Sequence, residues 1–175
     1  MNWIQALERF DPVVKPITIE SYISWLQHGV LFFDADYQRE YVWQEEEQQA
    51  FLRTAVSGFP LGHVALAKRP DWGTVDGPYI EVVDGKQRLT TIWLFITDEI
   101  PLILPEGPML WSQLTRGEQL AFGSASLPAV ELNNASRAQL LEFFYTTNFS
   151  GVAQSEAHKA HVLQLQAQIK PATAL

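Results

Sequence analysis

Apolar positions first show the spacing of an amphipathic helix in the segment TIESYISWLQHG. Four apolar residues of this segment follow the spacing i, i+3, i+4, i+7, which places them on one face of a helix: Ile19, Tyr22, Ile23 and Leu26. Thr18 stands where an N-cap is expected, and Gly29 is a typical stop. We therefore predict a core helix between Thr18 and Gly29.

Further helices are predicted from caps and apolar runs. One follows the glutamates at 45–47, which suit the positive end of a helix dipole, and stops at Gly58. Another is the apolar run 89–96. Two more begin after Ser136 and Ser155, which are placed as N-caps. The C-terminal part of the chain is therefore expected to be mostly helical.

Strands are predicted where short apolar runs replace the helical spacing. The run 30–33 indicates a buried strand, and LGHVALAKR at 61–69 and PYIEVVDG at 78–85 indicate two more. Prolines in PLILPEGP, residues 101–108, break the preceding helix, so we expect an extended connection there. A short helix and then a strand at 127–132 are expected after it.

Composition narrows the class of protein. A length of 175 residues with 47% hydrophobic residues is typical of one globular domain with a core. The absence of cysteine excludes disulfides and thiolate chemistry, and it favours a reducing compartment. We find no signal-like start and no apolar run long enough to span a membrane, so we expect a cytoplasmic protein without membrane contact. The net charge of -8 argues against broad non-specific binding to nucleic acid, yet a local basic pocket is compatible with it.

The stretch VVDGKQRLTTI leads from a strand into a helix through polar residues, and two interpretations apply to it. Asp84 and Gln87 match a capping box, in which the two side chains satisfy the first amides of a helix. Alternatively, free amides at the helix start attract phosphate, Gly85 lets a ligand approach the backbone, and Lys86 and Arg88 add charge. The two interpretations are compatible with each other.

Two other polar segments are candidates for ligand contact. In DYQREYVW, Gln38 and Arg39 follow a predicted strand, where ligand-binding loops cluster, although an arginine among aromatic residues is also typical of a stacked surface cation. In TTNFSG, Asn148 and Gly151 suit the end of a helix, and a polar amide beside exposed backbone also suits contact with a nucleotide. The residues leave both alternatives open at each segment.

Three segments, in this order, resemble the N-terminal domain of GmrSD-type restriction systems: YQREYVW, VVDGKQRLTTI and FFYTTNFSGVAQSEA. This resemblance implies an α+β fold, with a ParB/sulfiredoxin-like small mixed β-sheet flanked by helices and a helical C-terminal part. We expect an N-terminal arm at 1–17, a ParB-like core at 18–100, a mostly helical part of the same domain at 101–170, and a tail at 171–175.

The resemblance also implies a site for a nucleoside triphosphate with Mg²⁺. Domains of this kind bind nucleoside triphosphates, several hydrolyse them to control a nuclease that acts on modified phage DNA, and the similar pocket of ParB takes CTP. The residues implied in nucleotide binding are Gln38, Arg39, Gly85, Lys86, Gln87, Arg88, Asn148 and Gly151. Asp84 and Arg88 are implied in catalysis, and Asp84 is also the candidate metal ligand.

Two departures from the family pattern bear on activity. Lys86 stands where glutamine is usual, which adds charge, and Thr146 stands where arginine is usual, which removes one cation and leaves efficient hydrolysis open. A chain of 175 residues has no room for a second, HNH-type nuclease domain, so we expect a separate partner such as an HNH-type nuclease subunit.

Three functional hypotheses follow. The first is a nucleotide-binding regulatory module, with or without hydrolysis of ATP, GTP, CTP or UTP, in a DNA restriction-modification, phage-defence or phage-borne system. The second is a small metal-dependent DNA nuclease, for which Asp34, Asp36 and Asp84 are the available carboxylates. The third is an inactive interaction or decoy protein, which Thr146 and the acidic net charge favour.

Overall fold

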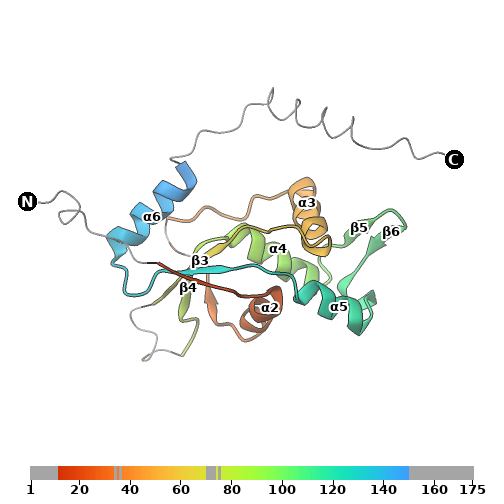
Figure 1. The fold of residues 1–175 in the computed structure, drawn as a ribbon, viewed down its shortest axis with the longest axis horizontal. Helices are drawn as coiled ribbons and strands as arrows, with labels where there is room; N and C mark the ends of the chain where they lie inside the picture. The colour runs from red at the N-terminus through yellow and green to blue at the C-terminus, as the bar shows by residue number, and fades with distance from the viewer. Residues whose placement is uncertain (1–11, 34, 36, 70–73, 75, 150–175) are drawn as a thin grey trace, which may run out of the picture. The chain divides into compact units, whose positions relative to one another are not determined.

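The computed structural model describes residues 12–33, 35, 37–69, 74 and 76–149, and Figure 1 shows the fold. The chain consists of two compact units, Met1–Glu142 and Phe143–Leu175. The predicted division into arm, core, helical part and tail stays a prediction.

The centre of the first unit is a mixed five-stranded sheet with the order β1-β7-β3-β4-β2. Its strands are β1 (Val13–Lys15), β2 (Leu31–Phe32), β3 (Val64–Lys68), β4 (Ile80–Asp84) and β7 (Ala129–Glu131). β3 pairs antiparallel with β4 and parallel with β7, and β2 runs parallel to β4 at one edge. The strands predicted from apolar runs are confirmed. β1 was missed because Val13 and Val14 are exposed, so no buried face marks it in the sequence.

The helices predicted from caps and apolar spacing are confirmed where the structure describes them. They are α2 (Ile19–Gln27), α3 (Glu45–Val56), α4 (Lys86–Ile96), α5 (Arg116–Gly123) and α6 (Arg137–Phe149), with a short 3-10 helix η1 (Trp111–Gln113). The helix predicted after Ser155 lies outside the described residues. The α+β class is confirmed. Within the described part of the chain, no helix has the length and apolar character needed to cross a membrane.

Residues 101–108 form a paired hairpin rather than a simple extended connection. β5 (Leu102–Leu104) pairs antiparallel with β6 (Gly107–Met109). Gln49 of α3 holds the hairpin, because its Nε2 donates to Pro101 O at 2.7 Å and its Oε1 accepts from Ile103 N at 2.8 Å. The prolines indicated the extended backbone, but they did not indicate the pairing.

The core forms where helices α2 to α5 pack together and against the sheet (Figure 1). α4 contributes three fully buried apolar side chains: Leu89, Ile92 and Phe95. Val64 and Val82, also fully buried, add the contribution of β3 and β4. Each such side chain contributes about 1.5–3 kcal/mol by leaving water. β4 and α4 are therefore held in fixed positions, and so is the turn that joins them.

Candidate functional site

The candidate site is built around the turn from β4 to α4. Gly85, the N-cap of α4, has φ +106°, and a Cβ at this position would lie 3.0 Å from both methyl groups of Val64. Glycine tolerates both the positive φ and the close approach of Val64, because it has no Cβ. The register of β3 and β4 also shifts between Ala65 and Leu66, and such bulges redirect a strand. The chain therefore turns sharply from β4 into α4 at Gly85.

The predicted capping box of Asp84 and Gln87 is wrong. The N-cap is Gly85, so Asp84 lies one residue too early to cap, and no side chain caps α4. Asp84 instead faces Arg88, with 3.9 Å between Oδ2 and Nη1. The first N–H groups of a helix have no partner inside the helix. In α4 the N-cap residue, Gly85, supplies no side-chain hydrogen bond to them.

Gln87 connects α4 to the loop that carries the YQREYVW motif. Its Oε1 accepts from Val42 N at 2.8 Å and from Trp43 N at 3.2 Å, and its Nε2 donates to Glu40 O at 3.0 Å. Both ends of the amide are therefore engaged with the protein. Gln87 brings two motifs together that lie more than 40 residues apart in the sequence.

Gln38 fixes the other side of this loop. β2 ends at Phe32, opposite Glu81, and beyond this pair no described strand continues along that edge of β4. Gln38 Nε2 donates to the carbonyls of Val82 and Val83 on that edge, the second at 3.1 Å. The side chain thus takes the place of a missing strand. Its Oε1 is buried without a hydrogen bond in the described chain.

Aromatic residues anchor the rest of the loop. The Tyr41 hydroxyl shares a hydrogen bond of 2.9 Å with Thr91 Oγ1 and accepts from Gln48 Nε2 at 3.0 Å. The ring of Trp43 lies 5.7 Å from that of Phe51, centre to centre. The loop is therefore docked on α3 and α4, and it holds Arg39 at a defined place on the surface.

A buried carboxylate beside the loop was missed by the sequence reasoning. Glu81 Oε1 accepts from the Tyr37 hydroxyl at 2.5 Å and lies 3.5 Å from Arg137 Nη1. Arg137 Cζ also lies 4.6 Å from the centre of the Tyr37 ring. Burial, together with the bond to Glu81, raises the pKa of Tyr37, so its hydroxyl stays protonated as a donor. The sequence did contain one indication of this buried carboxylate, because a glutamate stands inside the apolar run IEVV.

Three basic side chains near the turn differ in how the protein engages them. Arg88 Nη1 donates to His63 O at 2.6 Å. Lys86 Nζ lies 3.9 Å from Glu40 Oε2. Arg39 is exposed and has no hydrogen bond or ion pair with any residue that the structure describes. Arg88 is thus oriented by the protein, while the guanidinium of Arg39 donates to no residue that the structure describes.

The third predicted motif, FFYTTNFSGVAQSEA, lies in the second unit, and the structure describes only its first residues. Thr146 and Asn148 belong to α6, where Asn148 Nδ2 donates to Phe144 O at 2.9 Å. Gly151 lies outside the described residues, as do Asp34 and Asp36. The predicted contact of Asn148 and Gly151 with a nucleotide stays a prediction. In the described residues, no group of three His, Cys, Asp or Glu side chains is arranged to hold a metal ion.

Comparison with known families shows which family the domain containing this site belongs to. The family model described as GmrSD restriction endonuclease, N-terminal domain, matches residues 19–125, more than half of the chain. The chain belongs to this family. The matched region contains both motifs that meet at the β4–α4 turn, so the site lies within the GmrSD N-terminal domain. The resemblance stated from the sequence is confirmed.

Among solved structures, the GmrSD N-terminal domain described here is similar to the C-terminally truncated chromosome-partitioning protein ParB from Caulobacter crescentus, complexed with CTP-gamma-S. The two chains are 16% identical with a TM-score of 0.48, and the match covers 89% of this chain and 65% of the ParB chain. This chain therefore spans less than two thirds of that ParB chain. No curated protein matches the chain.

Proposed function

We propose that this GmrSD N-terminal domain binds a nucleoside triphosphate, with its phosphates at the β4–α4 turn. The observation that carries the proposal is the uncapped first turn of α4, with Arg88 held beside it by His63 O and Asp84. Uncovered amides at the positive end of a helix attract phosphate. A guanidinium adds paired, charge-assisted hydrogen bonds to phosphate oxygens.

The other residues of the site divide into binding and positioning roles. Gly85 permits the sharp turn from β4 into α4, and Lys86 and Arg39 add positive charge in a chain whose net charge is -8. Gln38 and Gln87 were predicted to bind the nucleotide, but their amides hold the loop. We therefore assign them to positioning Arg39.

Mg²⁺ fits this site as a companion of the phosphates. Magnesium in nucleotide sites usually takes one or two carboxylates together with phosphate oxygens, and Asp84 supplies one carboxylate at the turn. When bound there, Mg²⁺ would neutralise part of the phosphate charge. Hydrolysis is part of the proposal: Arg88 would stabilise charge on the transferred phosphoryl group, while Asp84 would hold the ion.

The last part of the proposal is that this domain regulates a nuclease in a restriction or phage-defence system. The family description names a restriction endonuclease, whereas the described residues hold no acidic cluster for a metal-dependent cut. We therefore assign DNA cleavage to a partner such as an HNH-type nuclease subunit, controlled by the nucleotide state of this domain.

The test is thermal stability with ATP, GTP, CTP or UTP in millimolar excess, each with Mg²⁺. A ligand at 100 times its Kd stabilises a protein by about 2.7 kcal/mol, so we expect one nucleotide to raise the Tm by several degrees. Arg88→Ala should abolish this shift. Arg39→Ala should weaken affinity on the order of 10-fold, because it removes charged hydrogen bonds.

Arg116→Ala is the matched control, since Arg116 is an exposed arginine on α5, away from the turn. Its shift should equal that of the wild type. A folded wild type whose Tm no nucleotide raises would overturn the proposal. Cleavage of a plasmid with Mg²⁺ alone would favour the nuclease hypothesis instead.

A further inference from the structure

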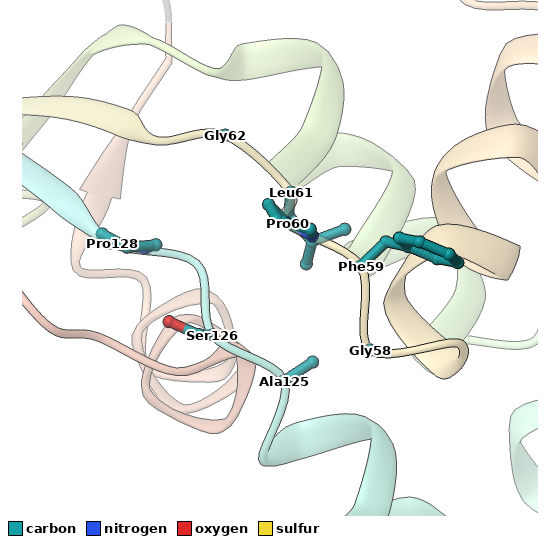
Figure 2. Close-up of a pocket in the computed structure, with 8 residues that line it drawn as sticks. All are labelled: Gly58, Phe59, Pro60, Leu61, Gly62, Ala125, Ser126 and Pro128. Carbon is teal, nitrogen blue, oxygen red and sulfur yellow. The ribbon is translucent and has the colours of Figure 1, made fainter.

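A cavity of about 320 Å³ lies between the segment that follows α3 and the segment that follows α5 (Figure 2). One wall is the loop 58–62, which leads from α3 into β3. Ala125, Ser126 and Pro128 form the opposite wall. The phosphate-binding role proposed above uses none of these residues.

Gly62 connects this cavity to the phosphate site. It lines the cavity, and a Cβ on it would lie 3.7 Å from Arg88 Nη2. The next residue, His63, accepts the hydrogen bond from Arg88 Nη1. A ligand whose phosphate contacts Arg88 would therefore have the rest of its structure next to the cavity.

The cavity walls are mostly apolar and carry a few unused polar groups. Pro60, Leu61 and Pro128 provide apolar surface. The hydroxyl of Ser126 and the amides of Leu61 and Gly62 have no hydrogen-bond partner among the described residues. Small-molecule sites typically combine apolar walls with a few placed polar groups, in volumes of about 300–1,000 Å³. This cavity has both properties, at the lower end of that range.

We infer that the cavity holds the nucleoside part of the nucleoside triphosphate. The inference rests on the proposed function, which places the phosphates at Arg88. The apolar walls suit the two faces of a planar base, and the Ser126 hydroxyl and loop amides suit its polar edge. Because a backbone N–H only donates, the edge that meets the loop carries acceptor atoms.

The experiment compares binding of ATP, GTP, CTP and UTP with binding of inorganic tripolyphosphate, each with Mg²⁺, to the full chain. The wild type should bind one nucleotide at least about 10-fold more tightly than tripolyphosphate. Ser126→Phe fills the cavity without touching Arg88, so nucleotide affinity should fall to that of tripolyphosphate, which should itself be unchanged. Ala50→Phe, at an exposed position on α3, is the control and should change neither affinity.

A second variant serves if Ser126→Phe fails to fold. Ser126→Ala removes only the hydroxyl and should weaken nucleotide binding about 3- to 10-fold, the effect of one hydrogen bond, with no effect on tripolyphosphate. If the wild type binds neither ligand, the proposed function fails together with this inference. If the wild type binds a nucleotide and both folded Ser126 variants keep its affinity, the proposed function stands and this inference is overturned.

Discussion

Gly85 determines whether β4 can pass directly into α4. Its φ of +106° lies in the left-handed region, which costs a residue with a side chain about 1–3 kcal/mol. The Cβ position is also blocked by Val64, a fully buried residue at the start of β3. A substitution therefore adds backbone strain and a steric conflict at the same atom.

We predict that Gly85→Ala lowers the free energy of unfolding by more than the backbone strain of about 1–3 kcal/mol alone. Gly29→Ala is the matched control, because Gly29 has φ +62° but no atom within 4 Å of its Cβ position. It should show only the backbone cost of about 1–2 kcal/mol. Urea unfolding of both variants gives the comparison. Equal losses would mean that the contact with Val64 is not decisive.

The two glutamines of the site show how folding adds to what residue type indicates. The family resemblance implied Gln38 and Gln87 in nucleotide binding, and in the structure their amides form hydrogen bonds with backbone groups of the protein. An amide both donates and accepts, so it also bridges backbone groups. Arginine only donates, and Arg39 meets no acceptor in the described chain. Whether a glutamine side chain meets backbone groups or a ligand depends on which segments folding brings next to it.

At the scale of elements, the described residues of the loop between β2 and α3 form no helix or strand. Side chains of neighbouring elements hold it: Gln87 of α4 contacts its backbone, and Gln48 of α3 contacts Tyr41. Such a loop opens locally when its anchors are removed. The position of Arg39 therefore depends on α4.

Gln87→Ala should release this loop. The variant loses three hydrogen bonds to the loop backbone, and each typically contributes about 0.5–1.5 kcal/mol. We expect faster hydrogen exchange at the amides of Val42 and Trp43, together with weaker nucleotide binding. Gln119→Ala removes a single bond, to Trp111 O, on a different helix, and should leave both amides protected. Unchanged exchange in Gln87→Ala would show that the aromatic anchors are sufficient.

At the scale of the whole molecule, the first unit, Met1–Glu142, contains the whole sheet and its core. The beginning of α6 belongs to this unit. Leu140 is buried, and Arg137 pairs with the buried carboxylate of Glu81. The boundary between the units therefore falls inside a helix, after the residues that complete the first unit.

We predict that a chain ending at Glu142 folds with a Tm within a few degrees of the full chain. A chain ending at Leu132 should be clearly less stable, because it loses the burial of Leu140, about 1.5–3 kcal/mol, and leaves Glu81 without Arg137. Thermal unfolding by circular dichroism measures both. Equal destabilisation of the two fragments would place the boundary later in the chain.

Local patterns in the sequence were sufficient for most helices and strands and for the family. Amphipathic spacing, caps and apolar runs act over a few residues, so they can be recognised without knowing the fold. The motifs YQREYVW and VVDGKQRLTTI are continuous for the same reason. They indicated the GmrSD resemblance and the chemistry of the turn.

The partners of these residues depended on the packed chain. Gln87 and Val42, Gln38 and Val83, and Tyr37 and Glu81 are 44 or 45 residues apart in the sequence. β1 joins the sheet by pairing with β7, across more than 100 residues. The cavity likewise has walls from 58–62 and 125–128. No local spacing encodes such contacts, because they arise only when burial of the core brings distant segments together.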